Sequence, residues 1–223
     1  MLSPSQLPCA SLLVFQLGCL LMRRLLVLLL ACGVSQLAIA AGDPARGQAL
    51  TTVCAACHGA DGKAVAATYP NLAGQNPRYL LRQLKAIKSK KRDVPVMAGQ
   101  LDAMTAQDLG DIAAFYASKV AAVSQAPDAA ALLAQGERIY RGGVMDKQVA
   151  ACTACHSPMG NGNPPAGFPL IRGQSVDYVV SQLTAYREGV RQTDDDYGQM
   201  MRMVASHLTD GEIKAVADRK SVV

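Results

Sequence analysis

Two copies of one short motif stand out in the sequence, each with two cysteines three positions apart and a histidine directly after the second. The copies read CAACH and CTACH, and their reactive residues are Cys54, Cys57, His58, Cys152, Cys155 and His156. Cysteines at this spacing on a helical turn can form thioethers to the two vinyl groups at one edge of a haem, which places the adjacent histidine under the iron. The motif therefore predicts two covalently attached haem c groups, with His58 and His156 as axial ligands.

A thioredoxin-like redox pair and a zinc site are the alternatives for these residues. A thioredoxin motif follows a strand in a βαβ unit, and no segment of useful length shows the period of two that marks a strand. Zinc needs four ligands, commonly as two separated pairs, whereas each copy offers one pair and its adjacent histidine. Only His207 is left over among the histidines, and we expect it at the surface. Haem attachment is the favoured interpretation.

The two motifs belong to a longer internal repeat. The motifs themselves are 98 positions apart, and the segments YPNLAGQ at 69–75 and FPLIRGQ at 168–174 are 99 apart. Further along, MAGQLDAMT from Met97 matches MRMVASHLT from Met201 at an offset of 104. Offsets that grow this slowly indicate two homologous halves with small loop insertions, which is a duplicated domain rather than a solenoid.

The repeat also selects candidates for the second axial ligand of each iron. Methionine is a usual alternative to histidine there and raises the reduction potential. Met97 and Met201 align with each other, on segments that we expect to be loops. The neighbouring Met104, Met200 and Met203 could compete, but they align with a leucine, a valine and a glycine. We therefore predict Met97 and Met201 as ligands.

Two prolines occupy matching places in the repeated loop, Pro70 in the first half and Pro169 in the second. A backbone carbonyl at either position could accept a hydrogen bond from Nδ1–H of the haem histidine, which would fix the tautomer and the orientation of the ring. The alternative is that each proline only shapes its loop.

The first forty residues predict a secretory leader. From Met22 the sequence has two arginines, an apolar run at 25–34 and then Ala38-Ile39-Ala40, a small-residue cleavage site. The apolar run is shorter than the roughly 20 residues that a membrane-spanning helix needs, which disfavours an anchor. We expect translation from Met22, a leader over 1–40 cleaved after Ala40, and a periplasmic location. The leader contains three of the seven cysteines, so the other four all belong to the motifs.

Each half is predicted to be a small helical domain. The expected helices are Pro44–Val53, Pro77–Lys90 and one from Thr105 in the first half, and Ala129–Arg141, Val176–Gly189 and one from Thr209 in the second. The fold class is therefore all-α, with domains at 41–121 and 129–223 joined by a linker at 122–128. Domains of this size have little core of their own, and only 4% of the residues are aromatic. We expect the haems to supply the missing bulk.

With these residues in view, the chain resembles the cytochrome c4 family, exported bacterial cytochromes c with two haems, over nearly all of 41–218. The segments that carry the resemblance are AGDPARGQ, both CxxCH motifs, the paired loops ending in GQ, RYLLRQLKAIK, YREGVRQ, and the two segments with threonine eight residues after methionine. The resemblance implies two tandem cytochrome c folds with their haems close together. It also implies His–Met ligation of both irons, which falls on His58 with Met97 and on His156 with Met201.

The resemblance further implies a place in respiration. Electrons would pass in the periplasm from an upstream donor, such as a quinol-oxidising complex, to a haem-copper terminal oxidase. A loose peripheral association of the protein with the membrane is compatible with this role. If both irons are six-coordinate, neither has an open position for a substrate, which favours an electron carrier over an enzyme. The alternatives are a dihaem peroxidase-like enzyme and a haem subunit of a dehydrogenase complex. A net charge of +5 over 223 residues is too weak to indicate a nucleic-acid partner.

Charge is distributed unevenly between the halves. Residues 41–126 contain ten basic and six acidic side chains, a net +4, and residues 127–223 contain ten and eleven, a net −1. The first half has a basic cluster of Lys85, Lys88, Lys90, Lys91 and Arg92, and the second has acidic residues at 194–196. These faces could simply be solvated, or they could steer the two ends of the molecule toward different redox partners.

The second half departs from the first near its C-terminus. Where the last helix of the first half has Phe115 and Tyr116, the offset of 104 places Arg219 and Lys220. The family pattern stops near Asp218, and the loss of two buried aromatic side chains could cost about 3–5 kcal/mol each. We therefore expect the second half to be the less stable one.

Overall fold

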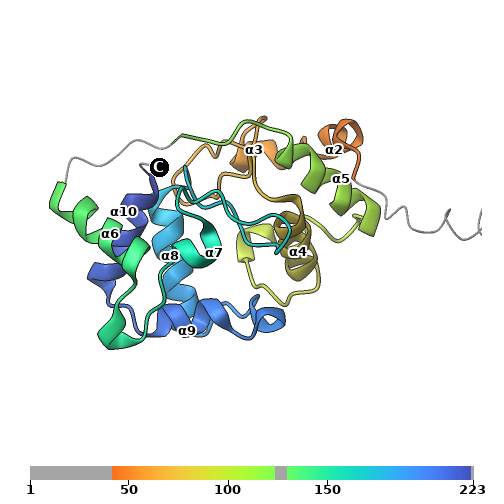
Figure 1. The fold of residues 1–223 in the computed structure, drawn as a ribbon. Helices are drawn as coiled ribbons and strands as arrows, with labels where there is room; N and C mark the ends of the chain where they lie inside the picture. The colour runs from red at the N-terminus through yellow and green to blue at the C-terminus, as the bar shows by residue number, and fades with distance from the viewer. Residues whose placement is uncertain (1–41, 124–129, 222–223) are drawn as a thin grey trace, which may run out of the picture. The chain divides into compact units, whose positions relative to one another are not determined.

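The computed structural model describes residues 42–123 and 130–221, with side chains as far as Asp218 (Figure 1). The predicted leader at 1–40 and residues 124–128 of the predicted linker lie outside the described residues. Within the described ranges the chain is helical, with two isolated β-bridges and no strand, so the all-α prediction is confirmed. No helix in these ranges combines the length and the apolar character that crossing a membrane would require.

Both halves contain the three helices that the sequence predicts, together with short helical turns that it does not. The first half has α2 (Pro44–Leu50), α3 (Ala55–His58), α4 (Pro77–Lys88), η1 (Pro95–Met97) and α5 (Ala106–Ala117). The second has α6 (Ala130–Gly142), η2 (Met145–Lys147), α7 (Thr153–His156), α8 (Val176–Arg187), η3 (Asp195–Tyr197), α9 (Met200–Ser206) and α10 (Asp210–Ser221). The middle helices end before Lys90 and Gly189, because both residues have positive φ, at 61° and 72°.

Reciprocal side-chain caps begin the last helix of each half. The hydroxyl of Thr105 accepts from the amide of Asp108 at 3.1 Å, and the Asp108 carboxylate accepts from the amide of Thr105 at 2.8 Å. Thr209 and Glu212 make the same pair of bonds at 3.3 and 2.8 Å. The Thr-x-x-acid pattern thus forms a capping box at the start of both α5 and α10.

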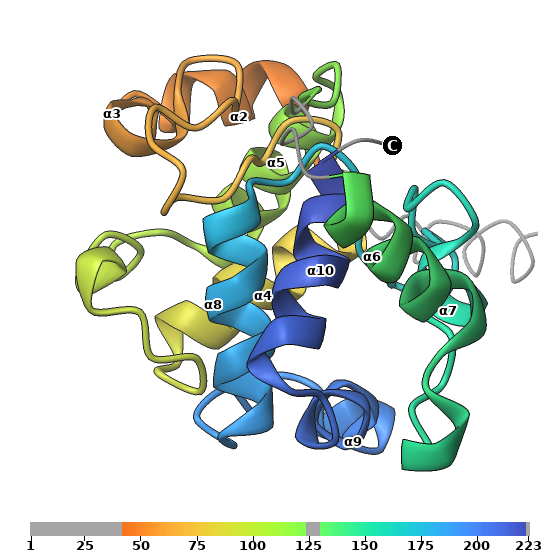
Figure 2. The same cartoon turned by 90° about the vertical axis from the view of Figure 1, so that its left-hand side faces the viewer.

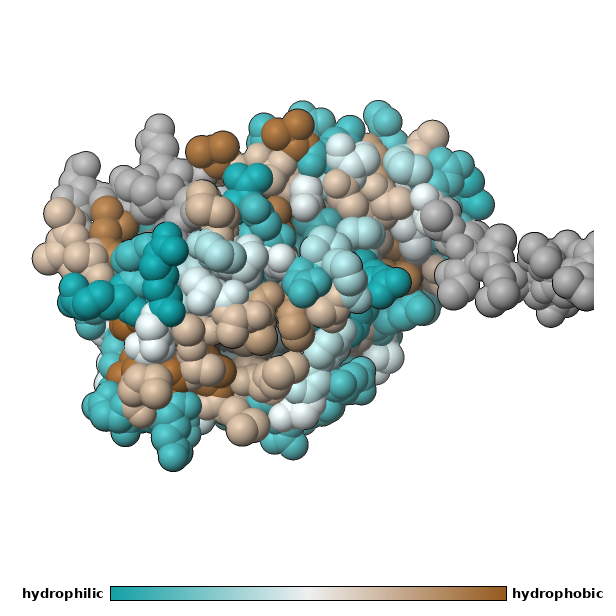
Figure 3. Space-filling model, in the orientation of Figure 1, coloured by the Kyte–Doolittle hydropathy of each residue, from teal (hydrophilic) through white to brown (hydrophobic). Residues whose placement is uncertain are grey.

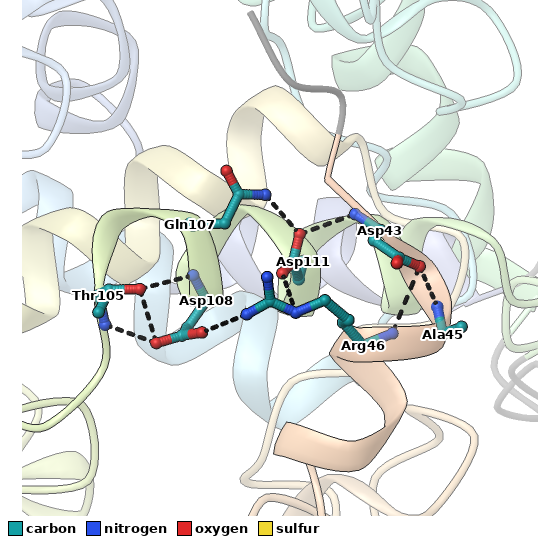
Figure 4. A network of polar contacts seen from close by, with 7 residues as sticks. All are labelled: Asp43, Ala45, Arg46, Thr105, Gln107, Asp108 and Asp111. Atoms are coloured by element: carbon teal, nitrogen blue, oxygen red, sulfur yellow. Dashed lines mark hydrogen bonds and ion pairs between the residues drawn. The ribbon is translucent and has the colours of Figure 1, made fainter.

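The first helix of the first half packs closely on its last helix. Gly47 in α2 lies so near α5 that a β-carbon there would be 2.1 Å from the backbone oxygen of Asp111, so only glycine allows the approach. Polar contacts also hold α2 against α5 (Figure 4). The amide of Asp43 donates to the buried Asp111 carboxylate at 2.7 Å, and Arg46 lies 3.1 Å from Asp108 and 3.4 Å from Asp111. These contacts compensate the burial of the Asp111 charge.

Each half has a hydrophobic core of its own. In the first half the core consists of Leu80 from α4 and Ile112, Ala113, Phe115 and Tyr116 from α5. In the second half α6 and α8 pack on α10 (Figure 2), and the core consists of Ile139, Tyr140, Val149, Leu208, Ile213, Ala215 and Val216. The one aromatic side chain in this second core, Tyr140, comes from the first helix of its half rather than the last.

The segment that carries Met201 differs from the predicted loop. Met201 lies in α9, and Met97 is the last residue of the short turn η1, so the expectation of a loop was wrong for Met201. The residues that raise the repeat offset from 99 to 104 lie in this part of the chain. The carboxylate of Asp194 accepts from the amide and Nε of Arg202 at 2.9 and 2.8 Å, and these bonds hold the first turn of α9.

Candidate haem-binding sites

The first CxxCH motif forms a single helical turn. The amides of Cys57 and His58 donate to the carbonyl of Cys54, at N–O distances of 3.3 and 2.9 Å. The turn ends at Gly59, where φ is +71°. Both cysteines are half-buried free thiols. Five consecutive residues therefore present two thiols and one imidazole, which is the set that covalent attachment of haem requires.

The second motif has the same backbone geometry. The amides of Cys155 and His156 donate to the carbonyl of Cys152 at 3.3 and 2.9 Å, the distances found in the first half. Ser157 takes the place of the terminating glycine, with φ at +68°. A serine in this left-handed region is uncommon, so the backbone keeps the shape of the turn even where the residue type does not favour it.

Each motif histidine is buried and oriented by a backbone carbonyl. The carbonyl oxygen of Pro70 lies 3.0 Å from Nδ1 of His58, and that of Pro169 lies 3.1 Å from Nδ1 of His156. Both histidines are 8% exposed. Burial lowers the pKa of His58, although the Pro70 carbonyl acts to raise it. A neutral ring whose Nδ1–H is bonded to a carbonyl has Nε2 as its ligand atom.

The methionines differ in their surroundings. Met97 and Met201 are both half-buried. Met104 packs against the hydrophobic core of the first half, whereas Met200 and Met203 are 38% and 63% exposed. Met201 is thus the least exposed methionine of α9. His207, which we expected at the surface, is exposed at the C-terminal end of the same helix.

The donor set in each half, two thiols and an imidazole oriented through Nδ1, fits a covalently attached haem. The sequence pattern of the cytochrome c family matches residues 44–118 and 134–218. A cytochrome c4 from Pseudomonas aeruginosa is 49% identical over 197 residues, which cover 88% of this chain and 96% of that protein. The chain belongs to the cytochrome c4 family. The predictions of two tandem cytochrome c domains and two covalently bound haem c groups are thereby confirmed.

Solved and characterised relatives of this cytochrome c4 family member agree on its general role. The crystal structure of reduced recombinant cytochrome c4 from Pseudomonas stutzeri has a TM-score of 0.78 and 44% identity, covering 81% of this chain and 98% of that one. A thiosulfate dehydrogenase electron acceptor from Stutzerimonas stutzeri is 34% identical over 170 residues, covering 74% of this chain and 76% of that protein. The chain is a dihaem electron-transfer cytochrome.

Sequence reasoning missed the glutamines that join the two halves. Gln75 donates from Nε2 to the carbonyl of Leu170 at 2.7 Å and accepts at Oε1 from the amide of Leu170 at 2.8 Å. Gln174 makes the same two bonds with Asn71, at 3.0 and 2.7 Å. Both glutamines are buried. The repeated GQ at the end of each loop was the available signal, and each half uses it to clamp the backbone of the other.

Two arginines complete this junction with approximate two-fold symmetry. Each guanidinium donates to one glutamine of its own half and to one glutamine and one tyrosine of the other half. The bonds are Arg92 to Gln83 (3.0 Å), Gln182 (2.9 Å) and Tyr178 (3.0 Å), and Arg191 to Gln182 (2.7 Å), Gln83 (2.9 Å) and Tyr79 (3.0 Å). The same residue types recur at an offset of 99, so the halves meet as the subunits of an isologous dimer do.

Much of the basic cluster in the last turn of α4 and directly after it is engaged within the molecule. Lys88 donates to the carbonyls of Leu101, Asp102 and Met104, at 3.1, 2.8 and 2.6 Å. Lys91 lies 3.5 Å from Asp195 and 3.9 Å from Asp196, and Arg92 belongs to the junction. Lys85 and Lys90 are exposed. The cluster therefore offers fewer free cations to a partner than its sequence suggests.

Proposed function

We propose that the protein is a periplasmic electron carrier whose two haem irons are held by His58 with Met97 and by His156 with Met201. The observation that carries the proposal is the repeated donor set: a CxxCH turn, a buried histidine bonded through Nδ1, and a half-buried methionine at a matching place in each half. Bound haem c supplies a one-electron redox centre. Two protein ligands on each iron leave no position for a substrate, so we propose no enzymatic activity.

The chain's own residues account for what each site must do. The motif cysteines anchor the cofactor covalently, and the carbonyls of Pro70 and Pro169 hold each imidazole in one tautomer. Burial of both histidines keeps water from the ligand side of the site. The methionine ligands favour the reduced state and so raise the potential.

The junction between the halves supports electron transfer from one site to the other. Asn71 and Leu170, whose backbones the glutamines clamp, directly follow Pro70 and Pro169 in the chain. Each clamp therefore acts one residue away from the carbonyl that orients a haem histidine. The two sites are linked by short covalent segments and hydrogen bonds, which suit a protein that holds two electrons and passes them singly.

For partners we propose an upstream donor, such as a quinol-oxidising complex, and a haem-copper oxidase as acceptor. Exposed apolar side chains occur beside the first site in sequence, with Val53 before Cys54 and Val96 before Met97. On the face drawn in Figure 3, brown hydrophobic residues lie in several separate places among teal hydrophilic ones. Small scattered apolar areas suit the brief contacts of redox partners better than a permanent interface.

The likeness to a thiosulfate dehydrogenase electron acceptor supports a second candidate, in which this chain receives electrons from a dehydrogenase. The two candidates differ in the donor and share the chemistry of the haem sites. Stopped-flow mixing of the oxidised protein with a thiosulfate dehydrogenase and thiosulfate, or with a quinol-oxidising complex and quinol, compares them directly. Faster reduction by the dehydrogenase would favour the second candidate.

Carbon monoxide separates a carrier from an enzyme. We expect the absorption spectrum of the reduced protein at neutral pH to stay unchanged on addition of carbon monoxide, because both irons have two protein ligands. Rapid stoichiometric binding would contradict this ligation and favour a peroxidase-like enzyme.

The mass of the exported protein tests the predicted cleavage of the leader. Cleavage after Ala40 leaves residues 41–223 and two haems.

A further inference from the structure

A buried tyrosine hydroxyl in the first half holds a proton that has no acceptor. Tyr116, in the last turn of α5, is 1% exposed and is among the largest fully buried side chains. Its hydroxyl makes no hydrogen bond within the described part of the chain. Leaving such a group unpaired costs stability, so a native protein has a reason for it.

The tyrosine ring is held in place from several sides. The amide of Gly74 donates to the carbonyl of Tyr116 at 2.9 Å. A β-carbon on Gly62 would lie 2.7 Å from Cδ1 of the ring, which shows how closely the backbone of the haem loop passes. Cys54 packs against the hydrophobic core that contains Tyr116. Burial, followed by the neighbouring Cys54 thiol, raises the pKa of the phenol, so the hydroxyl keeps its proton.

The covalent attachment of haem changes what Cys54 can do beside this hydroxyl. A free thiol has a proton of its own and is both a weak donor and a weak acceptor. A thioether sulfur has no proton and can only accept. Attachment at Cys54 therefore leaves this sulfur as an acceptor only, next to a buried hydroxyl donor that lacks a partner.

We propose that the Tyr116 hydroxyl donates a hydrogen bond to the thioether sulfur of Cys54 and thereby raises the reduction potential of the first haem. Hydrogen bonds and polarity around a haem set its potential, and a proton directed at the cofactor favours the state that holds the extra electron. Tyr116 is then a positioning and tuning residue. The inference rests on the proposed attachment of haem at Cys54.

The first half contains one competing acceptor for this proton, and the second half contains a buried tyrosine with a different partner. The Thr51 hydroxyl donates to the carbonyl of Gln48 at 2.9 Å and keeps lone pairs that could accept from Tyr116. In the second half, the Tyr140 hydroxyl donates to the carbonyl of Ser157 at 2.5 Å. The two halves therefore use their buried tyrosine protons differently.

The test is Tyr116→Phe in the haem-loaded protein, with each haem followed by the NMR signals of its methyl groups during a redox titration. Contacts of these methyls with the β-protons of Cys54 or Cys152 assign the signals to the halves. We expect the distribution of electrons between the haems to move about two- to tenfold away from the first haem, as the loss of one hydrogen bond predicts. The second haem keeps its potential.

Two variants make the result specific. Tyr186→Phe removes the hydroxyl of another buried tyrosine, which contacts Thr193, and should leave both potentials unchanged. Thr51→Val removes the competing acceptor, together with the hydrogen bond from Thr51 to Gln48, and should also leave both potentials unchanged. An unaltered first potential in Tyr116→Phe, or an equal shift in Thr51→Val, would overturn the proposal. Mass spectrometry of every variant reports haem attachment separately, so a failure of attachment at Cys54 is not mistaken for a failure of tuning.

Discussion

Met97 and Met201 are the residues whose replacement has the clearest expected outcome. Alanine at either position removes the thioether from one iron and leaves the other site intact. We expect Met97→Ala to lower the potential of the first haem and to open it to carbon monoxide, and Met201→Ala to do the same for the second. Potentiometric titration and carbon monoxide difference spectra should each show one altered and one unaltered haem.

The neighbouring methionines serve as matched controls. Met203 is 63% exposed in the same helix as Met201, so Met203→Ala should leave both spectra unchanged. Met104 packs in the core of the first half, and its replacement should lower stability without opening a haem. If Met203→Ala opened the second haem while Met201→Ala did not, the proposed ligand would be wrong.

Sequence alone identified the CxxCH residues because thioether attachment imposes a fixed local spacing. It could place Pro70 and Pro169 beside the histidines only through the repeat, since their bonds span 12 and 13 residues. It placed Met201 on a loop, and that was wrong. The helix around Met201 depends on Asp194 binding Arg202, a contact between charged residues that no periodicity reports.

At the scale of elements, the capping boxes of α5 and α10 make part of the stability depend on pH. Burial acts to raise the pKa of Glu212, but hydrogen bonds from Lys147 and Thr209 outweigh it and hold the pKa below its ordinary value of 4.5. A carboxyl with a lowered folded-state pKa stabilises fully above its unfolded value and loses that contribution as the pH falls through the folded value. We expect stability to drop below pH 4.5, and Glu212→Gln to remove part of that dependence.

Urea unfolding of the haem-loaded protein at a series of pH values measures this effect. Thr209→Ala, which removes the hydroxyl that caps α10, should cost about 1 kcal/mol at neutral pH. Glu188→Gln removes an exposed carboxyl and should keep the acid dependence of the parent protein. A Glu212→Gln protein that lost stability on acidification as steeply as the parent would show that this capping box is not a source of the effect.

Helices were predictable where their ends carry local signals, and were missed where they do not. Pro77 after Asn76 and the two Thr-x-x-acid patterns mark three helix starts from neighbouring residues alone. The turns α3 and α7 have four residues each, which is too short for an amphipathic period. They are set by the motif and by the loops that surround it.

At the scale of the whole molecule, the repeated GQ pointed to two residues of the junction between the halves, but the contacts themselves could not be predicted from sequence. Its hydrogen bonds join side chains about 90 to 110 residues apart in the chain, and each participant taken singly resembles a surface glutamine, arginine or tyrosine. The duplication did indicate two similar domains. The way in which they meet depends on side chains that satisfy one another only after both halves have folded.

Arg191 is the junction residue whose replacement should lower the free energy of unfolding most. It is 6% exposed and donates to Gln182, Gln83 and Tyr79. Arg191→Gln removes the donor to Tyr79 and one of the two guanidinium donors to Gln83 and Gln182, which keep Arg92. We therefore expect a loss of about 3 kcal/mol in the free energy of unfolding and slower electron exchange between the haems. Because Arg92 is only half-buried, Arg92→Gln should lower the free energy of unfolding by less. Equal losses in urea unfolding would show that burial does not set the strength of the junction.

The ends of α5 and α10 predict which half of the molecule opens first. The first half buries Phe115 and Tyr116 at the end of α5, where the second has Arg219 and Lys220 in sequence. Tyr140 supplies one aromatic side chain to the second core. The buried Asp218 lowers the stability of the second half. Burial raises the pKa of its carboxyl, although Lys214 acts to lower that pKa. Keeping Asp218 charged at neutral pH therefore costs stability, and the cost disappears as the pH falls.

We expect the amides of α10 to exchange hydrogen roughly a hundredfold faster than those of α5 in the intact, haem-loaded protein, since about one buried aromatic side chain separates the two cores. Asp218→Ala gives α10 the residue that α5 has at the matching position, Ala114, and should narrow the difference. Asp177→Ala removes an exposed carboxyl in the first turn of α8 and should not slow exchange in α10. Amides of α10 that exchange as slowly as those of α5 would mean that Tyr140 and the aliphatic core fully replace the missing pair.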